Sequence, residues 1–289
     1  MFRSVFKEIQ AAFDYGSMLT KIIIVNVAVY VITALLGAFF PEIYGTYILP
    51  YLAIPGDLLT LLYRPWTIIT HMFLHQGFWH MAMNMLILYW FGNIAGDLLG
   101  DKKILPVYFL GGLTGAIFYV LSYQLLPDVV GIYALGASAA VLAIVFTAVF
   151  TAPDYLMHLI LLGPVKIKYI GLTILFFDII GTAGNSNTGG HIAHLGGSLF
   201  GFLFVYLLRN GTDVSAWFYK NTDKRSKQNK KSSKLKIAHR SEVLQAKKEQ
   251  NDKGKATSEV DMILDKIKRN GYDSLTEEEK EILYRASKS

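Results

Sequence analysis

One hydroxyl group stands in the uncharged stretch LGASAAVLAIVF, and it belongs to Ser138. Its neighbours are small residues, among them Gly136, which we expect to support the serine by leaving space around it. A serine hydroxyl becomes a good nucleophile when a nearby base removes its proton. Small residues also surround a serine where two membrane helices simply pack closely. The stretch therefore indicates either a reactive serine or a packing position, and other residues must decide between them.

A histidine in a second apolar stretch, GGHIAHLGGSLFG, is a candidate for that base. His194 is followed by Gly197 and Gly201 at positions i+3 and i+7, so all three lie on one face of a helix. Glycines at this spacing allow two membrane helices to approach closely. Because imidazole gains and loses a proton near neutral pH, we expect His194 to reach Ser138 and to act as its general base.

A third stretch, HMFLHQGFWHMAMNML, supplies hydrogen-bond donors. His80 and Asn84 are four residues apart, so they project from the same face of a helix, one turn apart. Nucleophilic attack on a carbonyl group creates an oxyanion, which donors stabilise. We expect the side chains of His80 and Asn84 and the backbone N–H of Ser138 to supply them. His71 and His75 are expected to shape the preceding loop or to hold water near the site.

One acidic residue leaves several roles open. Asp178 lies inside an apolar stretch, where an acid is costly. It could be a third member of a triad, a gating residue or an interfacial residue. We favour the last two roles, since no acidic residue is obviously placed to orient His194. The histidines lack the HExxH pattern of zinc hydrolases and the chain has no cysteine, so we expect no metal and no cofactor.

Six apolar segments can position these groups. The chain has 289 residues, of which 53% are hydrophobic, and its mean hydropathy of +0.36 is high for a soluble protein. A helix needs about 20 apolar residues to cross a bilayer. On this basis we predict an all-α, polytopic membrane protein built on a six-helix bundle. The predicted membrane spans are 22–41, 79–98, 104–127, 131–151, 167–181 and 191–208.

The positions of the basic residues predict the orientation of this bundle. Short cytoplasmic loops are enriched in Lys and Arg. With the N-terminus in the cytoplasm, every Lys and Arg of the chain except Arg64 lies on the cytoplasmic side. Spans two, four and six then all run inward, so Ser138, His194 and the His80–Asn84 pair lie in one layer below the outer surface. We expect a multi-pass protein of the cell inner (plasma) membrane with both termini cytoplasmic.

Three motifs, which read HQGFWHMAMN, GASA and HLGGSLFG in chain order, resemble those of the rhomboid intramembrane serine proteases. The likeness covers residues 20–209. It implies that Ser138 is the nucleophile and His194 the general base. It also implies that His80 and Asn84 donate to the oxyanion, and that the substrates are single-span transmembrane proteins within the lipid bilayer.

The family resemblance implies further features. Residues 40–70 correspond to a membrane-embedded first loop, and Phe176 and Phe177 lie on the helix that moves to admit substrate. The chain departs from the family at Ala139, where the serine motif ends in glycine, and at Leu142, where an aromatic ring often stacks on the catalytic histidine. The alternative is a catalytically inactive rhomboid-like protein that binds client transmembrane helices. A channel or transporter is disfavoured, since the spans lack paired charges and a repeat.

A polar, Lys-rich tail follows the apolar body, and all of the formal net charge of +6 lies after Arg209. The capping pair Thr276 and Glu279 predicts a helix in the tail, which we expect to pair with a preceding helix. This hairpin is expected to bind a partner, a second copy or the membrane surface. Because no aromatic residues alternate with the lysines of this tail, we do not expect the tail to bind nucleic acid. The predicted regions are a cytoplasmic segment at 1–21, a membrane domain at 22–209, a disordered basic linker at 210–257 and the hairpin at 258–289.

Overall fold

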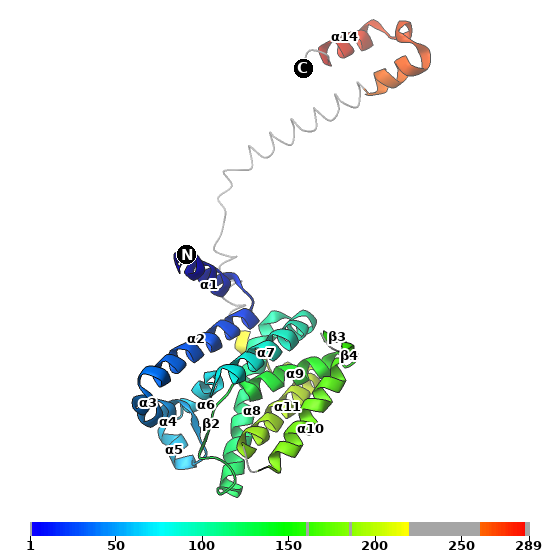
Figure 1. Cartoon of the computed structure of the whole chain (residues 1–289). Coiled ribbons are helices and arrows are strands. Elements are labelled where there is room, and N and C mark those ends of the chain that lie inside the picture. The colour runs from blue at the N-terminus through cyan, green and yellow to red at the C-terminus, as the bar shows by residue number, and fades with distance from the viewer. Residues whose placement is uncertain (1, 160–161, 185–186, 220–260, 287–289) are drawn as a thin grey trace. The chain divides into compact units, whose positions relative to one another are not determined.

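The computed structural model describes residues 2–159, 162–184, 187–219 and 261–286 (Figure 1). The chain divides into two units, Met1–Lys224 and Arg225–Ser289, and each is described by itself. The first unit contains the long apolar helices and all of the polar groups that the sequence singles out for chemistry.

Long helices make up the body of the first unit (Figure 1). They are α2 (Met18–Phe39), α7 (Phe78–Leu99), α8 (Ile104–Leu125), α9 (Ser138–Thr151), α10 (Ile167–Thr182) and α11 (Thr188–Arg209). Among the described residues, three helices are long and apolar enough to cross a membrane: α2, α11, and α8 together with the turn before it. The predicted all-α, polytopic membrane fold is confirmed.

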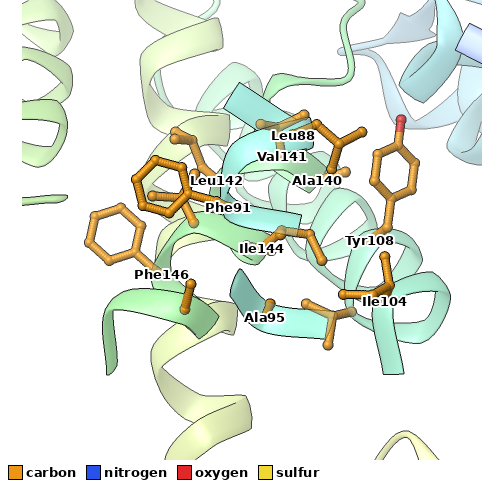
Figure 2. Close-up of a cluster of buried hydrophobic side chains, with 14 of the residues drawn as sticks. Leu88, Phe91, Ala95, Ile104, Tyr108, Ala140, Val141, Leu142, Ile144 and Phe146 are labelled. Carbon is orange, nitrogen blue, oxygen red and sulfur yellow. The ribbon is translucent and has the colours of Figure 1, made fainter. Parts of the chain in front are cut away.

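Helix α9 is the centre of the bundle, and it is shorter than predicted. It has 14 residues and so rises about 21 Å, less than the bilayer core of about 30 Å. It contacts α7, α8, α10 and α11, and most of its residues are buried. Figure 2 shows Val141 and Ile144 in one apolar cluster with Leu88 of α7 and Tyr108 of α8. A helix enclosed by protein does not need to reach both lipid surfaces, so the predicted span 131–151 was wrong at its start.

Glycines allow the neighbouring helices to approach α9 closely. A Cβ atom added at Gly197 would lie 2.0 Å from the backbone oxygen of Ala139, and one at Gly201 would lie 2.5 Å from that of Ala143. On the other side, a Cβ atom at Gly115 of α8 would lie 2.5 Å from the Cβ of Ala139. The predicted close packing at Gly197 and Gly201 is confirmed, and it brings α11 against the N-terminal half of α9.

The first loop is folded and reaches the start of α9. Trp66 donates from its indole nitrogen to the backbone oxygen of Tyr51 at 2.7 Å, and the Arg64 guanidinium donates to Pro50 at 2.9 Å. Strand β1 (Ile54–Pro55) pairs antiparallel with β2 (Tyr133–Ala134), just before α9. The loop thereby positions the chain that enters this helix. Its other elements are α3 (Pro41–Ile43), the π-helical turn η1 (Tyr44–Ile48), α4 (Leu49–Leu52), α5 (Leu58–Tyr63), α6 (Thr67–Thr70) and η2 (His71–Phe73).

Short elements lie at the end of the bundle where α9 and α11 finish and where α2 and α8 begin. Arg209, which ends α11, donates to the backbone oxygen of Phe150 near the end of α9 at 2.7 Å. The backbone N–H of Met18, at the start of α2, donates to the carboxylate of Asp101 at 2.9 Å. The first contact joins the ends of α9 and α11, and the second joins the start of α2 to the turn before α8. The elements at this end are α1 (Phe2–Tyr15), η3 (Asp101–Lys103), β3 (Leu156–Leu159) and β4 (Gly163–Lys166), the last two forming an antiparallel pair.

Residues 210–219 pack against the bundle, so the prediction of a disordered linker from residue 210 was wrong over this segment. The Lys103 ammonium lies 2.6 Å from the Asp213 carboxylate, and the Tyr219 hydroxyl donates to it at 2.6 Å. Burial by itself would raise the pKa of Asp213, but hydrogen bonds from Lys103, Ser215 and Tyr219 outweigh burial and hold the pKa below its ordinary value. The predicted linker at 220–257 lies outside the described residues.

The second unit contains a helical pair within residues 261–286. Residues 261–270 are helical, and Gly271 ends the helix with a φ of 80°, which favours glycine. A short turn, η4 (Tyr272–Ser274), leads to α14 (Glu277–Ala286). Thr276 and Glu279 exchange capping hydrogen bonds at 2.8 Å and 3.3 Å. Lys266 pairs with Glu279 at 2.8 Å and joins the two helices.

Candidate functional site

Ser138 is the first residue of α9, and two residues before it lies a glycine with a positive φ. Gly136 has a φ of 139°, a conformation that L-amino acids rarely adopt. Its N–H donates to the backbone oxygen of His71 at 2.9 Å. A Cβ atom at Gly136 would lie 3.3 Å from Cε1 of His80 and 3.4 Å from Oγ of Ser138. Glycine therefore leaves open the space between the serine hydroxyl and the His80 ring.

The Ser138 hydroxyl contacts the imidazole of His194. Oγ of Ser138 lies 2.6 Å from Nε2 of His194. His194 lies beyond the first turn of α11, because this helix begins at Thr188, earlier than the predicted span. The close approach of α11 to α9 brings the two side chains within hydrogen-bond distance. In this contact His194 can accept the serine proton.

Asp178 of α10 contacts the other side of the same imidazole ring. Oδ1 of Asp178 lies 2.8 Å from Nδ1 of His194, and the acid is buried. Ser138, His194 and Asp178 therefore form a Ser–His–Asp chain of the kind found in serine hydrolases. The interfacial role favoured from the sequence does not fit this buried acid, whereas the gating role stays a prediction. Helices α10 and α11 contact each other, and late residues of one meet early residues of the other. The available signal was a single acid within an apolar span.

A second histidine shares this carboxylate. Nδ1 of His191 also lies 2.8 Å from Oδ1 of Asp178, while Oδ2 of Asp178 is buried and has no hydrogen-bond partner among the described residues. A Cβ atom at Gly181 would lie 2.5 Å from the His191 ring, so the glycine provides the space for this ring. Ligand atoms of Asp178, His191 and His194 all lie within 4.8 Å of one another. Sequence reasoning did not predict this three-residue cluster.

The predicted oxyanion donors lie on α7, beside Ser138. The Asn84 amide donates to the backbone oxygen of His80 at 2.8 Å, which uses one of its two N–H groups. The amide is largely buried, and both side chains line the same cleft as Ser138. Because Ser138 begins α9, its backbone N–H has no acceptor within the helix. Three sources of donors therefore meet around the serine hydroxyl.

His71 and His75 do not reach the serine. Nδ1 of the buried His71 ring donates to the backbone oxygen of Thr67 at 2.8 Å, which keeps the ring within the first loop. His75 is buried edge-on between two rings, with centroids 6.4 Å from Tyr30 and 5.4 Å from His80. His71 supports the site through its backbone contact with Gly136, and His75 does so by packing against His80.

A cleft of about 430 Å³ leads to Ser138. Its walls come from α7, α9, α10 and α11 and are mainly apolar. Trp79 of α7 and Phe177 of α10 are 76% and 64% exposed, so these two helices present exposed aromatic side chains beside the cleft. The lining residues are Trp79, His80, Met83, Asn84, Ile87, Ser138, Val141, Leu142, Thr173, Ile174, Phe177, Asp178 and His194.

The fold and the site define a helical, polytopic membrane protein with a Ser–His–Asp arrangement at a cleft among its long helices. Residues 63–211, just over half of the chain, match the family described as Rhomboid domain. The chain belongs to the rhomboid family. Residues 247–289 match a second family, described as Family of unknown function (DUF6576), which includes the helical pair of the second unit.

Several curated relatives are named as mitochondrial proteins. RHOMBOID-like protein 12 of Arabidopsis thaliana is 32% identical over 158 residues, which cover 50% of this chain and 47% of the relative. Rhomboid protein 1 of Saccharomyces cerevisiae is 27% identical over 150 residues, or 51% and 43% of the two chains. Presenilin-associated rhomboid-like protein A of Danio rerio is 27% identical over 139 residues, or 46% and 35%. The chain spans less than half the length of each of these relatives.

Proposed function

We propose that the chain is an intramembrane serine endopeptidase that cleaves single-span membrane proteins near the outer face of the bilayer. The observation that carries the proposal is the distance of 2.6 Å between Oγ of Ser138 and Nε2 of His194, at a cleft among membrane helices. Membership of the rhomboid family supports the same class of reaction.

The first half of the reaction forms an acyl-enzyme. As Oγ of Ser138 attacks the scissile carbonyl carbon, its proton passes to Nε2 of His194. Asp178 accepts a hydrogen bond from the Nδ1–H of His194 throughout, stays ionised and so favours the resulting imidazolium. When the C–N bond breaks, His194 returns the proton to the amine of the leaving segment. The product at this stage is an ester between the remaining segment and Ser138.

The tetrahedral intermediate carries a negative oxygen that needs donors. The second N–H of the Asn84 amide, the His80 ring and the backbone N–H of Ser138 surround the space above the hydroxyl. Donors placed in advance stabilise this charge without rearrangement, and removal of one such donor slows catalysis about 10²–10³-fold in serine proteases.

Water completes the reaction. His194 removes a proton from a water molecule, the resulting hydroxide attacks the ester carbon, and the proton returns to Oγ of Ser138. The ring of His194 is partly exposed, with 20% of its side chain accessible. Water can therefore approach the ester from the open side of the ring.

The cleft determines which substrates fit. Its walls are apolar and the aromatic side chains Trp79 and Phe177 lie beside it. A transmembrane helix hides its peptide bonds in internal hydrogen bonds. We therefore expect substrates whose helix contains small or helix-breaking residues near its outer end, because such a segment can unwind and expose a carbonyl to Ser138.

The proposed orientation puts both termini in the cytoplasm. The site residues lie at one end of the bundle. Lys103, just before the start of α8, and Arg209, at the end of α11, lie at the other end. Basic helix ends favour the cytoplasmic side, which places Ser138 near the outer face of an inner (plasma) membrane.

Cleavage in proteoliposomes tests the proposal. The purified full chain is mixed with a single-span substrate that carries a helix-breaking segment and a tag at each end. The parent should release two tagged fragments. The Ser138→Ala variant should release none, because it lacks the nucleophile, whereas the Ser198→Ala variant, which loses only a buried packing serine, should cleave like the parent. Ser198 is buried on the same helix as His194 and serves as the control. Equal cleavage by Ser138→Ala and the parent contradicts the proposal. Substrate binding without cleavage by the parent indicates a client-binding protein instead.

A further inference from the structure

Asp178, His191 and His194 form a cluster that the protease mechanism does not fully use. Both imidazole Nδ1 atoms lie 2.8 Å from the same carboxylate oxygen, Oδ1 of Asp178. The second oxygen, Oδ2, is buried and has no hydrogen-bond partner among the described residues. Only 5% of the Asp178 residue is exposed, so little solvent reaches this oxygen. A triad needs one histidine on the carboxylate. The second histidine and the unpaired oxygen require a further explanation.

The three ligand atoms suit a transition-metal ion. Imidazole nitrogen and carboxylate oxygen are ligands for Zn²⁺, which binds them at about 2.0–2.2 Å. Tetrahedral coordination separates two such ligand atoms by about 3.3 Å, so each present contact of 2.8 Å would open by about half an ångström. Rotation of the two rings provides that movement, because 27% of the His191 side chain and 20% of the His194 side chain are accessible.

The donor set also excludes common alkaline-earth ions. Mg²⁺ and Ca²⁺ take oxygen ligands, whereas two imidazoles favour Zn²⁺, Cu²⁺ or Co²⁺. Three protein ligands leave the fourth position of Zn²⁺ for water, as at open zinc sites. The exposed side of the His191 ring gives an ion a route into the cluster from the solvent.

We propose that Asp178, His191 and His194 bind a divalent transition-metal ion of the Zn²⁺ type, and that this binding reversibly inhibits the protein. The binding half stands on the cluster alone. The inhibitory half rests on the proposed protease function.

Inhibition follows from the nitrogen that the metal takes. A neutral imidazole carries one proton, so a metal on Nδ1 of His194 leaves that proton on Nε2. Nε2 is the atom that must accept the proton of Ser138. A metal at this site also removes the Asp178 hydrogen bond that favours the imidazolium. The serine then keeps its proton, and acylation stops until the ion leaves.

Metal binding is measured first, without reference to activity. The full chain in detergent is titrated with Co²⁺, which has visible absorption bands where Zn²⁺ has none, and Zn²⁺ is then added in competition. We expect saturable bands from one ion per chain, loss of these bands on addition of Zn²⁺, and no effect of Mg²⁺. Absence of saturable binding by the parent overturns the proposal.

Variants assign the ligands. His191→Ala should weaken Co²⁺ binding at least about tenfold, because even the loss of a group that only supports a ligand costs about 10–100-fold. His191→Gln keeps a donor for Asp178 and should weaken binding equally, which excludes a general loss of structure. His158→Ala, an exposed histidine in β3, is the matched control and should bind like the parent. Unchanged binding by both His191 variants overturns the proposal.

The activity arm is separate. At about ten times the dissociation constant, about one molecule in eleven stays free of metal, so Zn²⁺ should slow cleavage about tenfold and a chelator should restore it. The His191 variants are judged by the ratio of their rates with Zn²⁺ and with chelator, which should be near one. Ser138→Ala should bind Co²⁺ like the parent, so a failure of the protease proposal leaves the binding result intact. Binding without inhibition overturns the inhibitory half.

Discussion

Asp178 and His194 lie on adjacent helices, 16 residues apart in the chain, and are joined by a contact of 2.8 Å between Oδ1 and Nδ1. This contact sets the tautomer of the imidazole, because a carboxylate at Nδ1 keeps the proton there and leaves Nε2 free to accept the proton of Ser138. In the proposed reaction the acid acts through the histidine and does not touch the reacting carbonyl. We therefore propose that Asp178 is a positioning residue.

Replacement of Asp178 by asparagine should slow the chemical step. Asp178→Asn keeps the size of the side chain but favours the wrong tautomer of His194, and the corresponding change in soluble serine proteases lowers kcat about 10⁴-fold. We expect kcat to fall at least about a hundredfold with KM little changed, measured with the tagged substrate in proteoliposomes. Asp128→Asn, at an exposed acid between α8 and β2, is the control. A fall in both variants, or a change in KM alone, rules out the positioning role.

Removal of the Asn84 amide should reduce transition-state stabilisation. Asn84→Ala deletes one oxyanion donor, so kcat should fall about 10²–10³-fold with little effect on KM. Asn93→Ala is a matched control, because Asn93 is exposed on the same helix and its amide makes the same kind of bond, to the backbone oxygen of Tyr89 at 2.7 Å. If the two variants retain equal kcat, Asn84 contributes no oxyanion donor.

A methyl group at Gly197 should push α11 away from α9. The added Cβ would lie 2.0 Å from the backbone oxygen of Ala139, and overpacking of this kind costs about 1–3 kcal/mol. Gly197→Ala should lower the thermal midpoint and, by lengthening the Ser138–His194 contact, lower kcat as well. Gly45→Ala adds the same methyl group where no atom lies within 4 Å. Parent-like stability and activity of Gly197→Ala argue against the close helix contact.

The Asp213 cluster should make stability depend on pH in the acidic range. Asp213 has a lowered pKa in the folded state, so its stabilisation is fully present above the ordinary value near 3.8 and is lost as the pH falls below it. Asp213→Asn should lower the unfolding free energy by about 1–2 kcal/mol at pH 7. The difference from the parent should stay constant down to about pH 5 and shrink towards pH 3. A difference that grows on acidification has the wrong sign for this account.

The residues of the candidate site were predictable because polar side chains are rare within apolar membrane spans and are therefore easily recognised. Ser138, His194, His80 and Asn84 lie in apolar stretches, and alternating helix direction places them at similar depth. The contact of Asp178 was not predicted, because the favoured roles treated α10 separately from α11. The same depth argument, applied to a span running outward, would have placed this acid beside His194.

The limits of α9 were not predictable from hydropathy. Residues 131–151 form one apolar run, yet the helix begins only at Ser138 because Tyr133 and Ala134 pair with the first loop. That pairing joins segments far apart in the chain. The same holds for residues 210–219, whose polar composition resembles a linker, although Asp213 binds Lys103 at the start of α8.

Labelling by a fluorophosphonate tests the central relationship, the activation of Ser138 by His194, most directly. The probe forms a covalent bond only with a serine whose proton is removed, and it needs no knowledge of the substrate. The peptide that contains Ser138, identified by mass spectrometry, should carry the probe in the parent, and His194→Ala should abolish the modification. A parent that stays unlabelled at Ser138, or a His194→Ala variant labelled as fast as the parent, contradicts the account.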